Sequence, residues 1–344
     1  MVRRHNSPGS PSARQGRTVN VNDMTPVFRN GPKAEPTSSP PPSLQSPPLA
    51  VLKYSALLGK PTRYSVSHVM YARLASVGAP QELYQHVRLD VEPAELGASL
   101  RAIEVLHFLG ANITQPYKLA VTQHLDRIDP IARHIGAVNT VKFAGGPIGY
   151  NTDWLGITSS LKRQAAKTDF DTATIFGSGG AARAAIYSCR QLGAKRVNVF
   201  YRPSISAATK SLLRQAEALE IYPLPYPRGL PECIERSQLV INATPVGMVG
   251  NDPTPFDLVQ LKGIPVNDKL YLDVVFNPNI TPLLRYFRTL GAAVIDGLWM
   301  MIHQGIAALS LWLDQAIIVD DSELQDTHLL LAKTISRPPR TARR

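Results

Sequence analysis

Apolar residues along the chain follow two spacings. Short apolar runs at residues 54–59, 86–91 and 108–114 are separated by stretches at 66–78 and 93–107, where apolar positions recur every three or four residues. The first spacing is typical of buried strands and the second of amphipathic helices. Their alternation predicts a mostly parallel sheet covered by helices, an α/β domain that we place at residues 51–155.

A second alternating series begins at residue 172. Its strands are predicted at 172–176, 196–201, 238–244, 271–276 and 292–296, and its helices at 181–192, 204–219 and 281–290. Between the two series, residues 116–126 and 129–136 have helical patterns, and residues 137–143 and 146–153 predict strands or a hairpin. The chain is therefore expected to form two α/β domains, the second at residues 156–297.

The stretch at residues 298–317 has a helical pattern that is too apolar for a helix facing solvent. We expect it to return to the first domain, which residues 298–330 would complete. No stretch approaches the roughly 20 apolar residues that a membrane span requires. A cytoplasmic protein without a membrane partner is therefore expected.

The two ends of the chain differ from its body. Residues 1–50 are rich in proline and serine and have almost no apolar periodicity, which predicts a disordered tail, and residues 331–344 predict a basic tail. Most of the net charge of +11 lies in these ends. A solvated or weakly anion-attracting tail is therefore favoured over a nucleic-acid-binding surface.

Composition also limits the chemistry. The only two cysteines, Cys189 and Cys233, lie far apart and away from any histidine cluster. This spacing favours buried thiols in a reducing compartment, and neither a disulfide framework nor a metal site is expected.

The segment between the first strand and first helix of the second series has the pattern of a dinucleotide-binding turn. Gly177, Gly179 and Ala182 occupy the three small positions of the fingerprint GxGxxG/A, with Gly180 and Ala181 between them. The first glycine allows a tight turn, the second lets the backbone approach a pyrophosphate, and the third small residue keeps helix and strand close. The second domain is therefore predicted to be of the Rossmann type.

The end of the following strand indicates the cofactor. An acid there usually binds the ribose hydroxyls of NAD, whereas an arginine accommodates the 2′-phosphate of NADP. This chain has Tyr201 and Arg202 and no neighbouring acid. The sequence therefore favours NADP, and NAD remains possible.

Two polar clusters in the first domain each contain one ionisable residue: Lys118 in GANITQPYKL, and Asp153 in GYNTDWLG. We expect Lys118 near the start of a helix after Pro116 and Asp153 in a short polar turn. A lysine beside a carboxylate can exchange a proton with a hydroxyl and stabilise developing alkoxide charge during reduction of a ketone. The side chains that would surround a polyol near these strand ends are Asn112, Thr114 and Asn139.

Several segments together resemble the shikimate dehydrogenase family, which includes the quinate/shikimate dehydrogenases. The likeness runs from about residue 54 to 317 through GKPTRYSVS, GANITQPYK, GAVNT, GYNTDWLG, GSGGAARA, INATPVGM and DGLWMMIHQG. It implies that Lys118 and Asp153 are the catalytic pair. By the same resemblance, the substrate ligands are Ser65, Ser67, Asn112, Thr114, Asn139 and Gln304. The cofactor residues are Gly177, Gly179, Gly180, Ala181, Ala182, Tyr201, Arg202, Asn242, Ala243, Thr244, Gly297 and Met300.

The chain departs from the family's pattern at three places. His68 stands where the serine pair is usually followed by proline, and Phe276 stands where a tyrosine is often found. The second arginine often seen beyond Arg202 is missing. These changes bear on how the serine loop is held, on one substrate hydrogen bond and on selectivity for NADP.

The sequence leaves three hypotheses. The first is an NADP-dependent shikimate dehydrogenase that interconverts 3-dehydroshikimate and shikimate, acting as a monomer or homodimer on a small-molecule substrate. The second is an NAD-dependent quinate or quinate/shikimate dehydrogenase. The third is a non-catalytic ligand-sensing regulator with the same fold.

Overall fold

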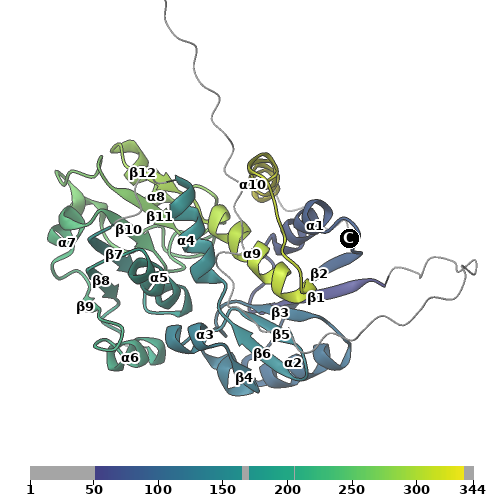
Figure 1. Ribbon diagram of the computed structural model, residues 1–344. Helices are drawn as coiled ribbons and strands as arrows, with labels where there is room; N and C mark the ends of the chain where they lie inside the picture. Colours follow the sequence, from purple (N-terminus) through teal and green to yellow (C-terminus); the bar gives the residue numbers. More distant parts are fainter. Residues whose placement is uncertain (1–50, 165–169, 205, 337–344) are drawn as a thin grey trace, which may run out of the picture.

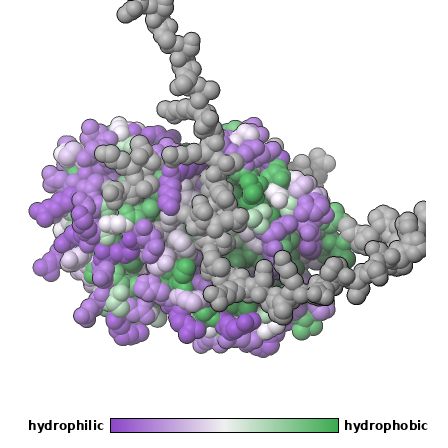
Figure 2. Space-filling model, viewed as in Figure 1, coloured by the Kyte–Doolittle hydropathy of each residue, from purple (hydrophilic) through white to green (hydrophobic). Residues whose placement is uncertain are grey.

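The computed structural model describes residues 51–164, 170–204 and 206–336, and the predicted tail at 1–50 lies outside them (Figure 1). These residues form two six-stranded sheets joined by helices. None of the described helices is both long enough and apolar enough to span a membrane. Hydrophilic residues cover much of the face seen in Figure 2 on the side of the second sheet.

The first sheet has the strand order β2-β1-β3-β5-β6-β4 and is parallel except for β5. Its strands are β1 (Lys53–Gly59), β2 (Tyr84–Asp90), β3 (Gly110–Ile113), β4 (Arg127–Ile128), β5 (Thr140–Phe143) and β6 (Pro147–Tyr150). Its helical segments are α1 (Ser67–Gly78), η2 (Pro93–Glu95), α2 (Leu96–Val105), η3 (Ala120–His124) and α3 (Pro130–Ile135). The α/β class and the mostly parallel sheet are confirmed.

The second sheet is wholly parallel, with the order β12-β11-β10-β7-β8-β9 that is typical of the Rossmann fold. Its strands are β7 (Thr172–Phe176), β8 (Arg196–Tyr201), β9 (Tyr222–Pro225), β10 (Leu239–Asn242), β11 (Leu270–Asp273) and β12 (Ala293–Ile295). Its helical segments are α5 (Gly180–Gln191), α6 (Ala207–Arg214), α7 (Leu230–Arg236), η4 (Leu258–Leu261) and α8 (Pro282–Thr289).

Two long helices lie side by side between the sheets: α4 (Asp153–Gln164), which leaves the first sheet, and α9 (Gly297–Leu313), which returns from the second (Figure 1). They approach closely because Gly156 has no side chain; a Cβ there would lie 2.6 Å from the carbonyl oxygen of Met300. At the far end of α9, the Trp312 indole donates a hydrogen bond to the Val141 carbonyl (2.9 Å). Helix α9 therefore contacts the first sheet at β5.

The predicted helix at 116–126 is wrong, because only the 3₁₀ turn η3 forms there and Lys118 lies in the preceding turn. The Lys118 carbonyl, which a helix would need for residue 122, accepts instead from the Val138 amide (2.8 Å). This bond ties the turn to the neighbouring β5 segment. A tertiary contact thus replaces local helical bonding.

Two other boundaries differ from the prediction. Helix α6 ends at Arg214 instead of 219, and the turn after it places Glu220 at a positive φ of 51°. Helix α10 (Asp321–Ile335) continues into the predicted basic tail at 331–344, of which 337–344 lie outside the described residues. Leu331 is buried against α1 and α9, which shows why this segment is helical.

A buried carboxylate organises the strand ends of the second sheet. Asp273, at the end of β11, is fully buried and accepts hydrogen bonds from Asn242 Nδ2 (3.0 Å), the Val275 amide (3.0 Å), the Tyr271 hydroxyl (2.9 Å) and the Thr281 hydroxyl (2.7 Å). Burial raises the pKa of Asp273 to about 6, although the hydrogen bonds oppose that shift. These bonds connect the ends of β10 and β11 to the start of α8.

We predict that Asp273→Asn becomes progressively more stable relative to the wild type as the pH rises from 4.5 to 6.5. The folded protein holds the Asp273 proton up to a pKa of about 6, whereas the unfolded chain loses it near 3.8. Wild-type stability should therefore fall by up to about 1.4 kcal/mol per pH unit in this window, and the asparagine removes that slope. Urea unfolding of both proteins across this range measures the difference; a difference independent of pH would contradict the prediction.

Candidate active site

A cavity of about 630 Å³ lies where the two sheets meet, and residues from both halves of the chain line it. It collects most of the residues that the sequence assigned to a site: Ser65, Ser67, Asn112, Thr114, Lys118, Asn139, Asp153, Gly177, Gly179, Gly180, Ala181, Tyr201, Arg202, Ala243, Thr244, Gly297, Met300 and Gln304. Ala182 and Asn242 are not among the lining residues, and both are fully buried behind it.

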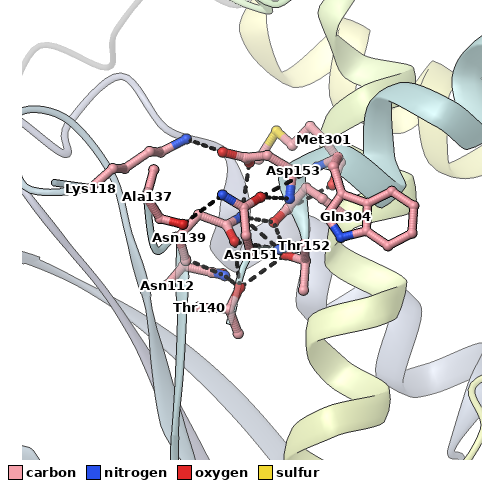
Figure 3. Close-up of polar contacts among 11 residues, drawn as sticks. Asn112, Lys118, Ala137, Asn139, Thr140, Asn151, Thr152, Asp153, Met301 and Gln304 are labelled. Carbon is pink, nitrogen blue, oxygen red and sulfur yellow. Dashed lines mark hydrogen bonds and ion pairs between the residues drawn. The ribbon is translucent and has the colours of Figure 1, made fainter. Parts of the chain in front are cut away.

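Lys118 and Asp153 both line the cavity and form an ion pair there (Figure 3). Lys118 Nζ lies 2.6 Å from Asp153 Oδ2, and the side chains are 17% and 5% exposed. Asp153 is the first residue of α4, and not part of a free turn as predicted; its amide donates to Asn151 Oδ1 (3.1 Å). An ion pair this deeply buried needs further hydrogen bonds to offset the loss of hydration.

Asn139 supplies one of those bonds. Its Nδ2 donates to Asp153 Oδ1 (2.8 Å) and lies 3.3 Å from Gln304 Oε1, while its Oδ1 accepts from the Thr152 amide (2.6 Å). Figure 3 shows these side chains converging from the residue before β5, the start of α4 and the helix α9. The two carboxylate oxygens of Asp153 thus face different donors, which fixes the orientation of the group.

Asn112 extends the network toward α1. Its Nδ2 donates to Thr140 Oγ1 (3.2 Å), and its Oδ1 accepts from the Tyr71 hydroxyl (2.6 Å). Burial raises the pKa of Tyr71 well above its usual value, so the hydroxyl remains a donor. The sequence did not identify Tyr71 because it occupies an apolar position of a helix.

Ser65 lies on the loop before α1, and Ser67 is the first residue of that helix. Ser65 Oγ accepts from the Ser67 amide (3.2 Å), and Ser67 Oγ is buried without a hydrogen-bond partner in the described part of the chain. His68 is the second residue of α1 and does not line the cavity. Burial, more than the nearby Arg88, lowers the pKa of His68 and favours its neutral form.

The glycine turn lies on the opposite side of the cavity. Gly177 has a positive φ of 121°, and a Cβ there would lie 2.8 Å from the Ala243 carbonyl oxygen. A Cβ at Gly179 would meet nothing within 4 Å. Gly180 lies against the lysine, since a Cβ there would be 2.8 Å from Lys118 Cβ. The turn therefore approaches Lys118 and leaves open space at the start of α5.

The start of α5 suits an anion. Gly179 occupies its N-cap position without a side-chain hydrogen bond, and its first turn has no acidic residue. Backbone N–H groups and the helix dipole favour negative charge at such an end. Further along the cavity, Arg202 is exposed, and Asp153 is the only carboxylate in the described lining.

Asn242 acts from behind the cavity wall. Its Oδ1 accepts from the amide (3.2 Å) and hydroxyl (2.7 Å) of Thr244, and its Nδ2 donates to Asp273. It therefore positions the Ala243–Thr244 segment without facing the cavity. Its predicted direct role as a cofactor contact does not agree with this placement.

A glycine turn that opens into the same cavity as a buried lysine–aspartate pair defines the class of protein as a two-domain, dinucleotide-dependent dehydrogenase. Comparison with known proteins agrees with this class. Residues 57–141 match the family model of the shikimate dehydrogenase substrate binding domain. The chain belongs to the shikimate dehydrogenase family, as its motifs indicated.

Individual relatives cover nearly the whole described chain. Shikimate dehydrogenase (NADP(+)) of Gloeothece citriformis is 33% identical over 280 residues, which cover 78% of this chain and 93% of that protein. The enzyme of the same name from a Synechococcus strain is 37% identical over 268 residues, covering 75% and 88%. Both therefore match the two halves of the chain together.

Solved structures give the same result. Shikimate 5-dehydrogenase of Thermus thermophilus in complex with NADP(H) and shikimate has a TM-score of 0.69 and 29% identity, covering 81% of this chain and 100% of that one. Quinate dehydrogenase of Corynebacterium glutamicum in complex with NAD has a TM-score of 0.68 and 29% identity, covering 81% and 99%. The fold alone is thus equally similar to both kinds of enzyme.

We predict that Asn139→Ala destabilises the protein by about 2 to 3 kcal/mol, because a buried oxygen of Asp153 loses its amide donor. The exposed Asn251 provides a matched control, and Asn251→Ala should change stability by less than about 0.5 kcal/mol. Chemical unfolding of both variants measures the effect. Equal stability of the two would contradict the assigned network.

Proposed function

We propose that this protein is an NADP-dependent shikimate dehydrogenase that reversibly reduces 3-dehydroshikimate to shikimate. The observation that carries the proposal is the placement of Gly180, which follows the second fingerprint glycine of the dinucleotide turn, directly against Lys118, whose ammonium group is paired with the buried Asp153. A dinucleotide bound at the turn would therefore lie beside a group able to exchange a proton.

Lys118 is the proposed acid in the direction of reduction. Bound NADPH supplies the hydride. The Lys118 ammonium group donates a proton to the oxygen of the ketone as negative charge develops on it, and in the reverse direction the neutral amine takes the proton from the hydroxyl. Asp153 orients the lysine, and Asn139 holds Asp153 in turn.

The polar side chains around this pair suit a hydroxylated ring. Asn112, Thr114, Asn139 and Gln304 offer amide and hydroxyl groups on the first-sheet side of the cavity. Ser65 and Ser67, at the start of α1, lie at the other end of this polar wall, where we place the substrate carboxylate. The unpartnered Ser67 Oγ supports this assignment, because buried hydroxyls rarely remain without a partner.

The open space beside Gly179 and the uncapped start of α5 fit a pyrophosphate. Arg202 lines the cavity beyond Tyr201, and no carboxylate of the described lining stands there to bind free ribose hydroxyls. A guanidinium group matches the geometry of a phosphate. These features favour NADP.

A second candidate is an NAD-dependent quinate or quinate/shikimate dehydrogenase. The likeness to the quinate dehydrogenase that binds NAD supports it, since the fold matches that enzyme as well as it matches shikimate dehydrogenases. A monomeric or homodimeric state and a cytoplasmic location stay predictions.

Turnover with the two ring acids and the two cofactors tests the proposal. We expect the purified protein to reduce NADP in the presence of shikimate, which is seen as a rise in absorbance near 340 nm. We expect it to reduce NADP more efficiently than it reduces NAD. Preferential oxidation of quinate with NAD would favour the second candidate. Inactivity with both acids and both cofactors would exclude the proposed reaction.

We predict that Lys118→Ala lowers kcat by about 10² to 10⁴, the usual contribution of a positioned acid–base group. The KM for shikimate should change by less than about tenfold, because other polar groups hold the ring. Lys53 pairs with Glu82 outside the cavity, so Lys53→Ala is the matched control and should retain kcat. Retention of kcat by the Lys118 variant would remove its catalytic role.

A further inference from the structure

The loop at residues 61–67 closes one end of the cavity and is held from behind by β2. Arg88 Nη1 donates to the carbonyl oxygens of Arg63 (3.1 Å) and Ser65 (2.6 Å). Two residues further along β2, Asp90 Oδ1 accepts from the amide (2.6 Å) and the hydroxyl (2.5 Å) of Thr62. These bonds fix the path of the backbone that carries the two serines.

The same loop is also held from across the cavity. Asn277, in the loop that follows β11, donates from Nδ2 to the Tyr64 carbonyl oxygen (3.1 Å). This bond connects the two halves of the chain and sets the position of Tyr64 relative to Phe276, which also lines the cavity. Tyr64 was not assigned a role from the sequence.

The two walls at this end of the cavity differ in chemistry. Val274, Val275 and Phe276 on the second-sheet side contribute apolar side chains. Hydroxyl groups come from the 61–67 loop, which contributes Thr62, Tyr64, Ser65 and Ser67 to the lining. An oxygen-rich substrate group at this end would therefore find its donors on the loop.

Tyr64 is oriented by its neighbour. The Arg63 guanidinium lies over the Tyr64 ring, 4.5 Å from the centroid, and Arg63 Nη2 donates to the Tyr64 hydroxyl (2.8 Å). A phenol oxygen that accepts from a cation keeps its own hydrogen free and becomes a stronger donor. Such a donor suits an anion.

The charges around the loop agree with an anionic ligand. Arg63 and Arg88 form no salt bridge with the described residues, although Asp90 lies close enough to Arg63 for the arginine to lower its pKa, after the larger effect of the Thr62 hydrogen bonds. Asp153 is the only carboxylate in the described lining and is paired with Lys118. A carboxylate beside Ser67 would therefore face two arginines placed behind the loop.

We propose that Tyr64 is a specificity-determining residue: its phenol donates a hydrogen bond to the carboxylate of the substrate, beside Ser65 and Ser67, and Arg63 orients that phenol. This assignment rests on the proposed function for the identity of the substrate. It predicts that Tyr64 discriminates an acid from its neutral ester while leaving the chemical step unchanged.

Comparison of shikimate with methyl shikimate tests the assignment. In Tyr64→Phe, kcat/KM for shikimate should fall about tenfold through KM, the effect of losing one hydrogen bond to a charged group, whereas kcat/KM for the ester should change less than about twofold. Arg63→Gln should show the same pattern in weaker form. Tyr222 also lies beneath an arginine, with Arg196 3.9 Å from its ring centroid but outside the cavity, so Tyr222→Phe is the matched control.

Calorimetric binding of shikimate separates this proposal from the proposed function. If the wild type turned over neither ring acid, the proposed reaction would be excluded. If Tyr64→Phe nevertheless bound shikimate about tenfold more weakly than the wild type, the assignment of Tyr64 to the carboxylate would still hold. If the enzyme is active and Tyr64→Phe has the same kcat/KM as the wild type for both shikimate and its methyl ester, the proposed role of Tyr64 is wrong. Absence of shikimate binding to the wild type, or equal losses for acid and ester, would overturn it as well.

Discussion

The buried ion pair between Lys118 and Asp153 is the constraint on which the site depends. Its members come from a turn after β3 and from the first residue of α4, and the pair is largely buried at the wall of the cavity. Charges in such a place are tolerated only with further donors. Asn139 meets this requirement, while Asn151 accepts from the Asp153 amide, so the need to satisfy one carboxylate determines how β5, α4 and α9 converge.

Helix packing keeps that convergence rigid. The absence of a side chain at Gly156 brings α4 against α9, and α9 carries both Met300 and Gln304 to the cavity. The substrate side and the cofactor side are thus connected by the two helices that cross between the sheets. The segment that follows the Rossmann-type sheet completes the polar wall of the first sheet.

Local patterns predicted most of the architecture, because apolar spacing and the glycine turn depend on short-range geometry. Residues fixed by distant partners were less predictable. The turn at Lys118 depends on the hydrogen bond that its carbonyl accepts from the Val138 amide. Asn242 is buried because its side chain donates a hydrogen bond to the buried Asp273. Leu331 was assigned to a tail because its partners on α1 and α9 are far away in sequence.

The contact between Gly180 and Lys118 couples two segments that otherwise belong to different halves of the chain. A side chain at position 180 would have to displace the stem of the lysine, whatever its effect on a dinucleotide. The range of residues acceptable in the turn is therefore set partly by a group outside the nucleotide-binding sheet. If this sheet were exchanged for that of another Rossmann-type protein, the new turn would fit against Lys118 only if it also had a glycine at this position.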